Sequence, residues 1–191
     1  AAYPGTDHKV TEQLTHMIST IGENMNIRRA AVISVENGCL AAYTHNALAS
    51  NVGKIGVIVA VKSDGDAEKL GELGRQLAMH VAATKPQSIS QADLDPEVVE
   101  RERAILADQA RESGKPEEII EKMLDGRLRK FFEDVCLVDQ TFVIDGETKV
   151  AQVVEKAAEE IGSEVTIDGF EILVLGEGIE KKEEDFAAEV A

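Results

Sequence analysis

The feature that most limits the possible folds of this chain is a charged block, residues 95–134, with a single break in it. Asp95 followed by Pro96 is typical of the start of a helix. The break, "SGKP" at residues 113–116, places a glycine past the end of one helix and a proline in the first turn of the next. The block is therefore expected to form two helices joined by a short turn, with mixed charges on a solvated face.

Apolar residues recur at helical spacing on both sides of this break. They are Val99, Leu106 and Ala110 before it, and Ile120, Leu124, Leu128, Phe131 and Val135 after it. Two facing apolar stripes joined by a short turn predict an antiparallel helical hairpin. Because its other faces are highly charged, we expect the hairpin to project from the body of the protein as an arm.

The part of the chain before the arm mixes helix and strand patterns. A helical stripe over residues 11–21 is followed by "AVISVE" and "CLAAYTH", which flank Asn37-Gly38. This dipeptide predicts a β-hairpin, because a type I′ turn needs positive φ at both central residues. A third strand is expected in "GKIGVIVAVKS", followed by a helix from Ala67 to about Ala83 capped by Asp66. The inward stripe of that helix would comprise Leu70, Leu73, Leu77, Ala78 and Val81.

The part after the arm returns to the same mixture. "VCLVDQTFVID" is typical of extended segments, "TKVAQVVEKAAEEIG" of a helix with Val150, Val153 and Ala157 inward, and "GFEILVLGEG" of a strand. The predicted fold is α+β: two small lobes with antiparallel sheets and packed helices, plus the inserted hairpin. The expected divisions are a first lobe (1–66), a second lobe (67–94 and 135–178), the arm (95–134) and a C-terminal helical module (179–191).

Composition narrows the possible functions. Hydrophobic residues make up 43% of the chain and aromatic residues only 4%, so the core must be aliphatic. A net charge of -16 repels phosphate backbones, which argues against direct nucleic-acid binding and favours a protein partner. The sequence has neither an apolar run of roughly 18 residues nor a signal-peptide pattern at its start, so we expect a cytoplasmic protein without a membrane segment.

Residues that could carry chemistry do not cluster. The four histidines lie in four separate segments, and Cys39 and Cys136 have no ligand spacing to each other or to a histidine. The Gly-Lys pair at residues 53–54 lacks the other residues of a phosphate-binding loop. We therefore expect no metal, no cofactor and no catalytic constellation.

Two segments nevertheless look specific. In "MHVAATKP", His80 lies near the end of a helix, where a structural role and a functional one are about equally consistent with the pattern. In "IGENMNIRRAAV", a helix end followed by a strand would explain Asn24 and Asn26 as turn residues. It would not explain an exposed isoleucine or the pair Arg28-Arg29.

Four segments together resemble the bacterial elongation factor Ts family, the nucleotide-exchange factors of the GTPase elongation factor Tu. They are "IGENMNIRR", "AMHVAATKP", "ESGKPEEIIEKMLDGRLRKF" and "GEGIEKKEEDFAAEVA", in the family's order along nearly the whole chain. The resemblance implies two α+β lobes, a coiled-coil arm inserted in the second lobe, and elongation factor Tu as partner. Such arms can also mediate assembly, so a homodimer is possible in the family.

The resemblance also assigns roles to residues. Ile21 and Gly22 would approach the partner's phosphate-binding loop, and four residues would brace that tip: Asn24, Asn26, Arg28 and Arg29. His80 and Val81 would contact a different domain of the partner. Phe186 would lie in the C-terminal module, which packs on the nucleotide-binding domain in some members of the family.

The chain departs from the family pattern at its start. Members of the family begin with a small helical domain and a Thr-Asp-Phe-Val segment, and this chain starts beyond both. We therefore expect a truncated form. The alternative to an exchange factor is then a core that binds elongation factor Tu, or dimerises, with impaired exchange.

Overall fold

The computed structural model describes residues 1–112, 114 and 116–179. Contacts divide the chain into two compact units, Ala1–Val32 and Ile33–Ala191, and we describe each by itself. The first unit holds one helix, α1 (Val10–Ile21). The second holds, in chain order, β1 (Gly38–Ala49), β2 (Val52–Lys62), α2 (Ala67–Thr84), η1 (Gln91–Asp93), α3 (Pro96–Arg111), α4 (Glu117–Val135), η2 (Leu137–Asp139), α5 (Val150–Ile161) and β3 (Thr166–Val174).

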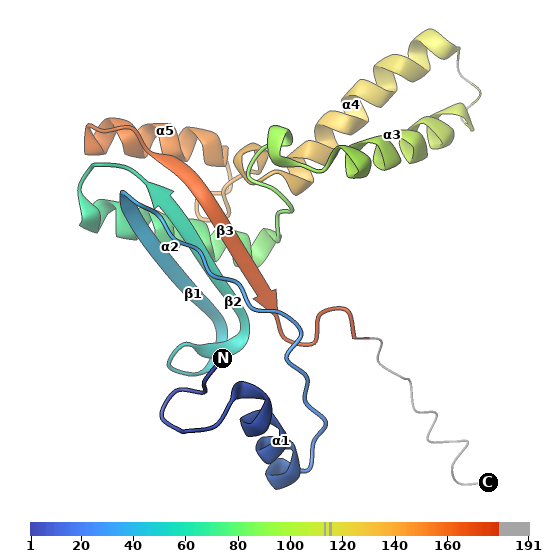
Figure 1. Ribbon diagram of the computed structural model, residues 1–191. Coiled ribbons are helices and arrows are strands. Elements are labelled where there is room, and N and C mark those ends of the chain that lie inside the picture. The colour runs from blue at the N-terminus through green and yellow to red at the C-terminus, as the bar shows by residue number, and fades with distance from the viewer. Residues whose placement is uncertain (113, 115, 180–191) are drawn as a thin grey trace, which may run out of the picture. The chain divides into compact units, whose positions relative to one another are not determined.

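The strands form one antiparallel sheet with β2 in the centre (Figure 1). Val57, Val59 and Val61 alternate along β2 on the face that packs against α2 and α5. Facing them is the predicted stripe of α2, which is buried at all five positions: Leu70, Leu73, Leu77, Ala78 and Val81. The core is thus aliphatic, as the shortage of aromatic residues requires.

Helix α2 begins and ends with local signals. Asp66 accepts hydrogen bonds from the backbone N–H groups of Glu68 and Lys69, both at 3.0 Å, which confirms the predicted cap. At the other end Lys85 adopts the left-handed conformation (φ 50°), and its N–H donates to the Val81 carbonyl. These two ends place His80 near the C-terminal end of the helix.

The predicted hairpin at Asn37-Gly38 is wrong. Strand β1 starts at Gly38, residues 31–35 belong to neither helix nor strand, and the hairpin turns between β1 and β2 at Ser50-Asn51. Gly38 (φ 143°) is needed for a different reason: a Cβ there would collide with the Val61 carbonyl oxygen of β2. A glycine selected by close approach of two strands produced the same local pattern as a turn glycine.

Two further expectations need correction, although the α+β class is confirmed. Strands expected in separate sheets of two lobes pair in the same three-stranded sheet, because β2 has partners from both parts of the chain. The segment from Val135 to Asp145, expected to be extended, forms the end of α4, the short helix η2 and turns. The predicted lobe boundaries stay a prediction.

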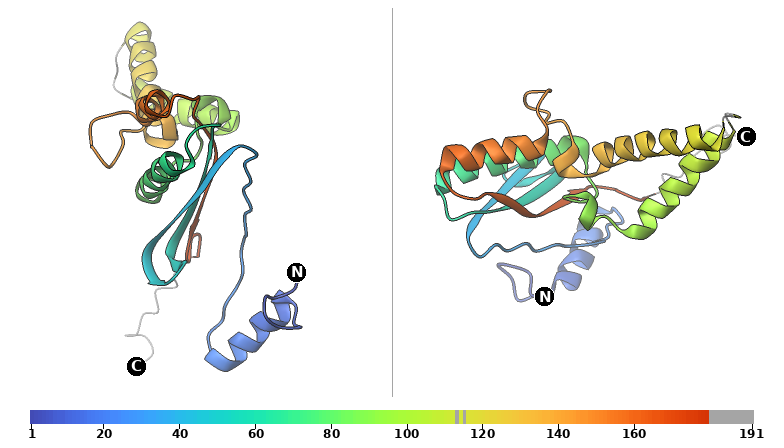
Figure 2. Two further views of the ribbon diagram at one scale, coloured as in Figure 1. Left: turned by 90° about the vertical axis from the view of Figure 1, so that its left-hand side faces the viewer. Right: turned by 90° about the horizontal axis from the view of Figure 1, so that it is seen from above.

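Helices α3 and α4 pack on each other and form the predicted helical hairpin (Figures 1 and 2). Ala110, Ile120 and Leu124 are buried between them. Further along the pair, the Arg127 guanidinium donates to Gln109 Oε1 at 3.4 Å. The description of this hairpin as a coiled coil stays a prediction.

Helices α1 and α5 have the same length and the same residue types at their ends, although they lie in different units. Each has 12 residues, starts with valine after a lysine (Lys9 or Lys149) and ends with isoleucine before a left-handed glycine (Gly22 or Gly162). In α5 the apolar stripe packs on the core of the second unit, whereas no residue of α1 is buried. The apolar side of α1 is therefore accessible in the described structure.

Candidate functional site

The first candidate region is the end of α1 and the segment after it, residues 21–29. Gly22 adopts the left-handed conformation (φ 80°), and its N–H donates to the Ile18 carbonyl at 2.9 Å. A Cβ on Gly22 would meet no atom within 4 Å, so backbone conformation and not space favours glycine within this chain. The Ile21 side chain is 54% exposed at this end of the helix. The result is an open backbone turn beside an exposed aliphatic side chain.

The four polar residues assigned to bracing this tip are all exposed: Asn24, Asn26, Arg28 and Arg29. The turn hydrogen bonds expected for the two asparagines are not found within the described part of the chain. Residues 24–35 belong to no helix or strand, so the asparagines lie in an irregular segment instead of a tight turn. The structure thus places six of the predicted site residues on one accessible segment, Ile21–Arg29.

The second candidate region surrounds His80, whose side chain has no exposed surface. Its Nε2 lies 2.9 Å from Gln140 Oε1, and the Val143 N–H donates to its Nδ1 at 3.2 Å. Because a backbone N–H can only donate, Nδ1 is the acceptor and the proton is assigned to Nε2. Burial lowers the pKa of His80 below its usual value, and the hydrogen bond to Gln140 opposes that shift. The imidazole is therefore held neutral in one tautomer.

Val81 is also fully buried, in the core beneath the sheet. Neither of the two predicted contact residues in α2 therefore presents its side chain at the surface. The ring of Phe142 covers His80 at a centroid distance of 5.6 Å. The part that these residues take in binding stays a prediction, and the geometry allows it only through the segments that they hold in place.

Sequence reasoning missed the exposed apolar pair that His80 holds. Val143 and Ile144 are 43% and 49% exposed in the loop before α5. The loop is closed by Asp145, whose Oδ1 accepts from the N–H groups of Glu147 and Thr148 at 3.0 and 3.1 Å. The Asp145-Gly146 dipeptide was an available turn signal, and it would have separated this apolar pair from a strand.

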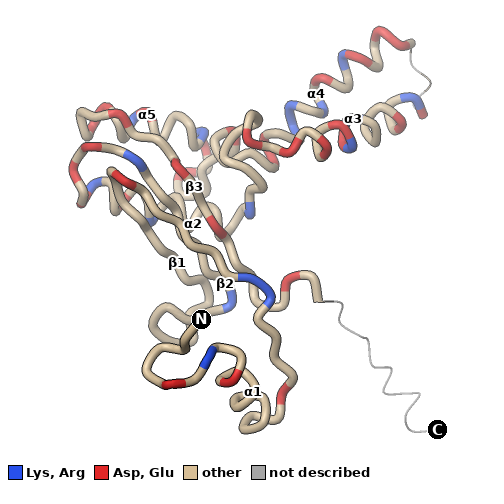
Figure 3. The backbone as a smooth tube through the Cα atoms, viewed as in Figure 1, with Lys and Arg blue, Asp and Glu red and all other residues tan. Residues whose placement is uncertain are grey.

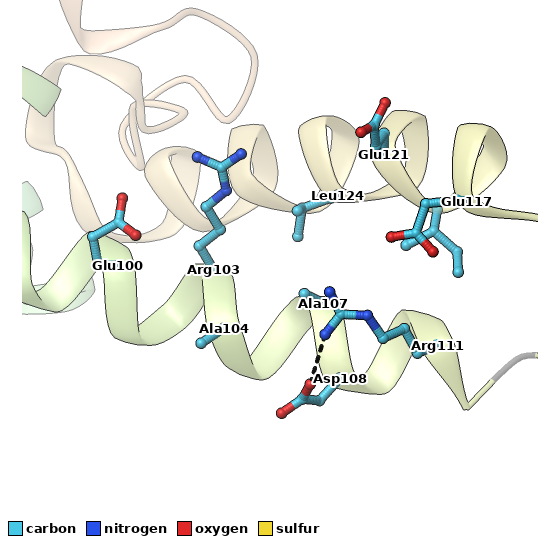
Figure 4. A pocket seen from close by; sticks show the side chains of 10 residues that line it. Glu100, Arg103, Ala104, Ala107, Asp108, Arg111, Glu117, Glu121 and Leu124 are labelled. Carbon is cyan, nitrogen blue, oxygen red and sulfur yellow. Dashed lines mark hydrogen bonds and ion pairs between the residues drawn. The ribbon is translucent and has the colours of Figure 1, made fainter.

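The arm also has a hollow, of about 380 Å³, between α3 and α4 (Figure 4). Charges of both signs line it, including the ion pair between Arg111 and Asp108 at 3.1 Å. Figure 3 shows acidic and basic residues mixed along both helices of the arm. Mixed charges of this kind are typical of a solvated helix face.

Other functional groups can be placed more briefly. No group of histidine, cysteine and carboxylate side chains able to hold a metal ion occurs among the residues that the structure describes. In the same residues, no helix is both long and apolar enough to cross a membrane. The Phe186 contact falls outside the described residues, as does nearly all of the predicted C-terminal module.

The segments singled out above lie within a region that matches a known protein family. The family model described as Elongation factor TS matches residues 1–177. Proteins named Elongation factor Ts from Rhodospirillum centenum and Rhodospirillum rubrum are 57% and 56% identical to the chain, over 99% and 100% of it. One from Gluconobacter oxydans is 58% identical over 95% of the chain. The chain spans 62%, 62% and 58% of the length of these three relatives. Because the family model matches residues 1–177 of this 191-residue chain, the chain belongs to the elongation factor Ts family.

Proposed function

We propose that this chain acts in cytoplasmic translation elongation as a guanine nucleotide-exchange factor for elongation factor Tu, promoting GDP release by binding the GTPase. The observation that carries the proposal is the match to the elongation factor Ts family over residues 1–177. The activity is conformational work on another protein's site, and no covalent step is required of this chain.

Exchange requires that factor and nucleotide weaken each other's binding to the same GTPase. The coupling is reciprocal, so each weakens the other by the same factor. A ten-thousandfold effect corresponds to about 5.5 kcal/mol of differential binding between the two states of the partner. Several separate contacts supply such an energy more readily than one, and accessible segments in both units support an extended interface.

In this proposal the Ile21–Gly22 tip approaches the magnesium and phosphate site of the partner. Gly22 presents backbone without a side chain, and the exposed Ile21 supplies an apolar probe. Asn24, Asn26, Arg28 and Arg29 would orient the tip or contact an acidic surface. A planar guanidinium suits the latter because it can bind a carboxylate through two hydrogen bonds.

The second contact in this proposal is the loop that contains Val143 and Ile144. His80 and Val81 would act from beneath it: Val81 anchors α2 in the core, and His80 accepts the hydrogen bond of the Val143 N–H. Phe186 would contribute a third contact. Exposed aliphatic side chains on a loop braced by buried groups lose little freedom on binding, which favours affinity.

The direct test is stopped-flow release of fluorescent GDP from elongation factor Tu. We expect the release rate to rise with the concentration of the chain and to reach a plateau. Ile119→Ala serves as a control, since Ile119 is an exposed isoleucine of the arm and is given no contact role. A release rate that does not respond to the chain, although binding is measurable, would overturn the proposal.

That outcome would support the second candidate, a core that binds elongation factor Tu or dimerises without releasing GDP. Light scattering would separate the two forms of it, because a homodimer doubles the mass in the absence of the partner.

A further inference from the structure

Gln140, whose side chain is nearly buried, connects three helices through its side chain and its backbone carbonyl. Its Oε1 accepts from His80 Nε2 and from Thr84 Oγ1, both at 2.9 Å, and both donors belong to α2. Its amide Nε2 donates to the carbonyl of Asp134, in the last turn of α4, at 2.7 Å. Its backbone carbonyl accepts the Val150 N–H at the start of α5, at 3.0 Å.

These hydrogen bonds have only one consistent direction. The Asp134 carbonyl can only accept, so it must face the NH₂ of Gln140, and this orients Oε1 toward His80. An acceptor at that point requires a proton on His80 Nε2. In a neutral imidazole, Nδ1 then carries no proton and is free to accept from Val143. The side-chain amide of Gln140 thus determines whether His80 Nδ1 can accept the hydrogen bond of the Val143 N–H.

We propose that Gln140 is a positioning residue for the loop that contains Val143 and Ile144. It selects the neutral, Nε2-protonated form of His80, which in turn holds the Val143 backbone at the base of the exposed apolar pair. That this loop contacts elongation factor Tu rests on the proposed function; the positioning itself does not.

The charged groups around this junction do not replace Gln140. They are Glu133 and Asp134 at the end of α4, Asp139 in η2, and Lys149 before α5. Lys149 pairs with Glu133 at 3.2 Å and also donates to the Asp139 carbonyl at 2.7 Å. The imidazole has no ion pair with any of them among the described residues, and its polar partners are Gln140 and Val143. A negative charge introduced at position 140 would therefore lie against an imidazole that has no ion pair among the described residues.

The first test uses the unmodified chain and does not depend on a variant that folds. Nitrogen-15 NMR of the imidazole ring distinguishes the two tautomers and the charged form. We expect His80 to be neutral near pH 7 with its proton on Nε2. A proton on Nδ1, or a charged ring at this pH, would overturn the proposal.

The second test is Gln140→Glu. The carboxylate can still accept from His80 and Thr84 but loses the hydrogen bond to the Asp134 carbonyl. Its negative charge favours the charged imidazole, so the pKa of His80 should rise. The new Nδ1–H would then face the Val143 N–H. The exchange rate of that amide, relative to its intrinsic rate at the same pH, should therefore increase as the pH falls. A rise of one pKa unit changes the protonated-to-neutral ratio of the ring by about tenfold, so a change of that order in exchange rate is expected near pH 6.

Gln152→Glu is the matched control, because it makes the same chemical change on the exposed side of α5. Gln152 Oε1 accepts from the Lys149 N–H, and a glutamate can do the same. We expect wild-type behaviour of His80 and Val143 in this variant. A folded Gln140→Glu variant whose His80 pKa and Val143 exchange match those of the control would overturn the positioning role.

Affinity for elongation factor Tu, measured near pH 6 and near pH 8, separates this proposal from the proposed function. We expect the affinity of Gln140→Glu to fall at the lower pH more than that of the control. If Val143 exchange responds and affinity does not, positioning stands and the contact role of the loop is overturned. If Val143 exchange does not respond, the positioning role fails whatever the affinity.

Discussion

At the scale of single residues, the candidate functions divide by exposure. Ile21 and Gly22 are accessible, and nothing within their own unit encloses them. His80 is enclosed and hydrogen-bonded at both ring nitrogens. Substitution of an accessible residue should therefore change binding with little effect on folding, whereas substitution of the enclosed histidine should change both.

Ile21→Ala tests the accessible class. Since the side chain is 54% exposed, its truncation should leave helix content and the free energy of unfolding nearly unchanged. If the side chain packs on elongation factor Tu, calorimetric titration should show a weaker affinity, by about tenfold for a loss near 1.4 kcal/mol. Ile119→Ala, at similar exposure on the arm, should bind as the wild type does. Equal affinities of the two variants would remove Ile21 from the interface.

The pH dependence of stability tests the enclosed histidine. Its pKa lies below 6.5 in the folded chain, so between the two values the unfolded chain binds a proton that the folded chain does not. The free energy of unfolding should therefore rise with pH through this window, and the rise should level off above about pH 6.5. Urea unfolding near pH 5.5 and pH 7.5 measures the difference, and His80→Gln should reduce it. The same slope in the variant would show that other groups cause it.

Two exposed carboxylates whose pKa is lowered titrate below this window. Hydrogen bonds from backbone N–H groups lower the pKa of Asp66, and hydrogen bonds from Gln76 and Arg75 lower the pKa of Glu72. Stability that depends on a lowered carboxyl pKa is present above the unfolded value and is lost as the pH falls below it. Those unfolded values are 3.8 and 4.5, both below the histidine window.

At the scale of elements, α2 packs so closely on β1 at Gly74 that a side chain there would collide with the sheet. A Cβ on Gly74 would lie 2.7 Å from Ala41 Cβ in β1. In α4, by contrast, a Cβ on Gly126 would meet no atom within 4 Å. Gly74 and Gly126 therefore have different causes: Gly74 is required by packing, and Gly126 is not required by any contact in the described structure.

Replacing each of these glycines by alanine should change stability in opposite directions. Gly74→Ala should destabilise the chain by about 1–3 kcal/mol because the helix must move from the sheet. Gly126→Ala should stabilise it by roughly 0.5–1 kcal/mol because alanine has the higher helix propensity. Thermal and urea unfolding of both variants provides the comparison. Stabilisation by Gly74→Ala would contradict the packing of α2 on β1.

The arm depends on a small buried seam. Leu124→Ala should cost about 2–5 kcal/mol, toward the lower value because Leu124 also lines the open hollow between α3 and α4. The loss should be seen as fraying of α3 and α4 in hydrogen exchange, while the amides of β2 stay protected. Loss of protection in β2 at the same rate would show that the arm and the sheet unfold together.

The elements that sequence could predict are those with local causes. The start of α2 at Asp66, its buried stripe and the break between α3 and α4 all follow from neighbouring residues. The hairpin at Asn37-Gly38 was predicted wrongly, because Gly38 lies close to β2 and pairs with Lys62, 24 residues further along. The His80–Gln140 contact was missed for the same reason, since 60 residues separate its partners. The Ile21–Arg29 segment was identified by resemblance, and local chemistry alone left it ambiguous.

At the scale of the whole molecule, the chain carries a net charge of -16. This charge suits a protein partner better than a nucleic acid and predicts association that slows as salt rises if the partner's docking surface is basic. The proposed function requires more than association: binding of this chain and binding of GDP to elongation factor Tu must oppose each other.

The most direct test of that requirement is the affinity of the chain for elongation factor Tu measured twice, with the partner free of nucleotide and with it saturated by GDP. An exchange factor should bind the nucleotide-free partner more tightly. The ratio of the two affinities should equal the factor by which the chain weakens GDP binding. Equal affinities in the two titrations would contradict the proposed function, and would show a protein that binds the GTPase without exchanging its nucleotide.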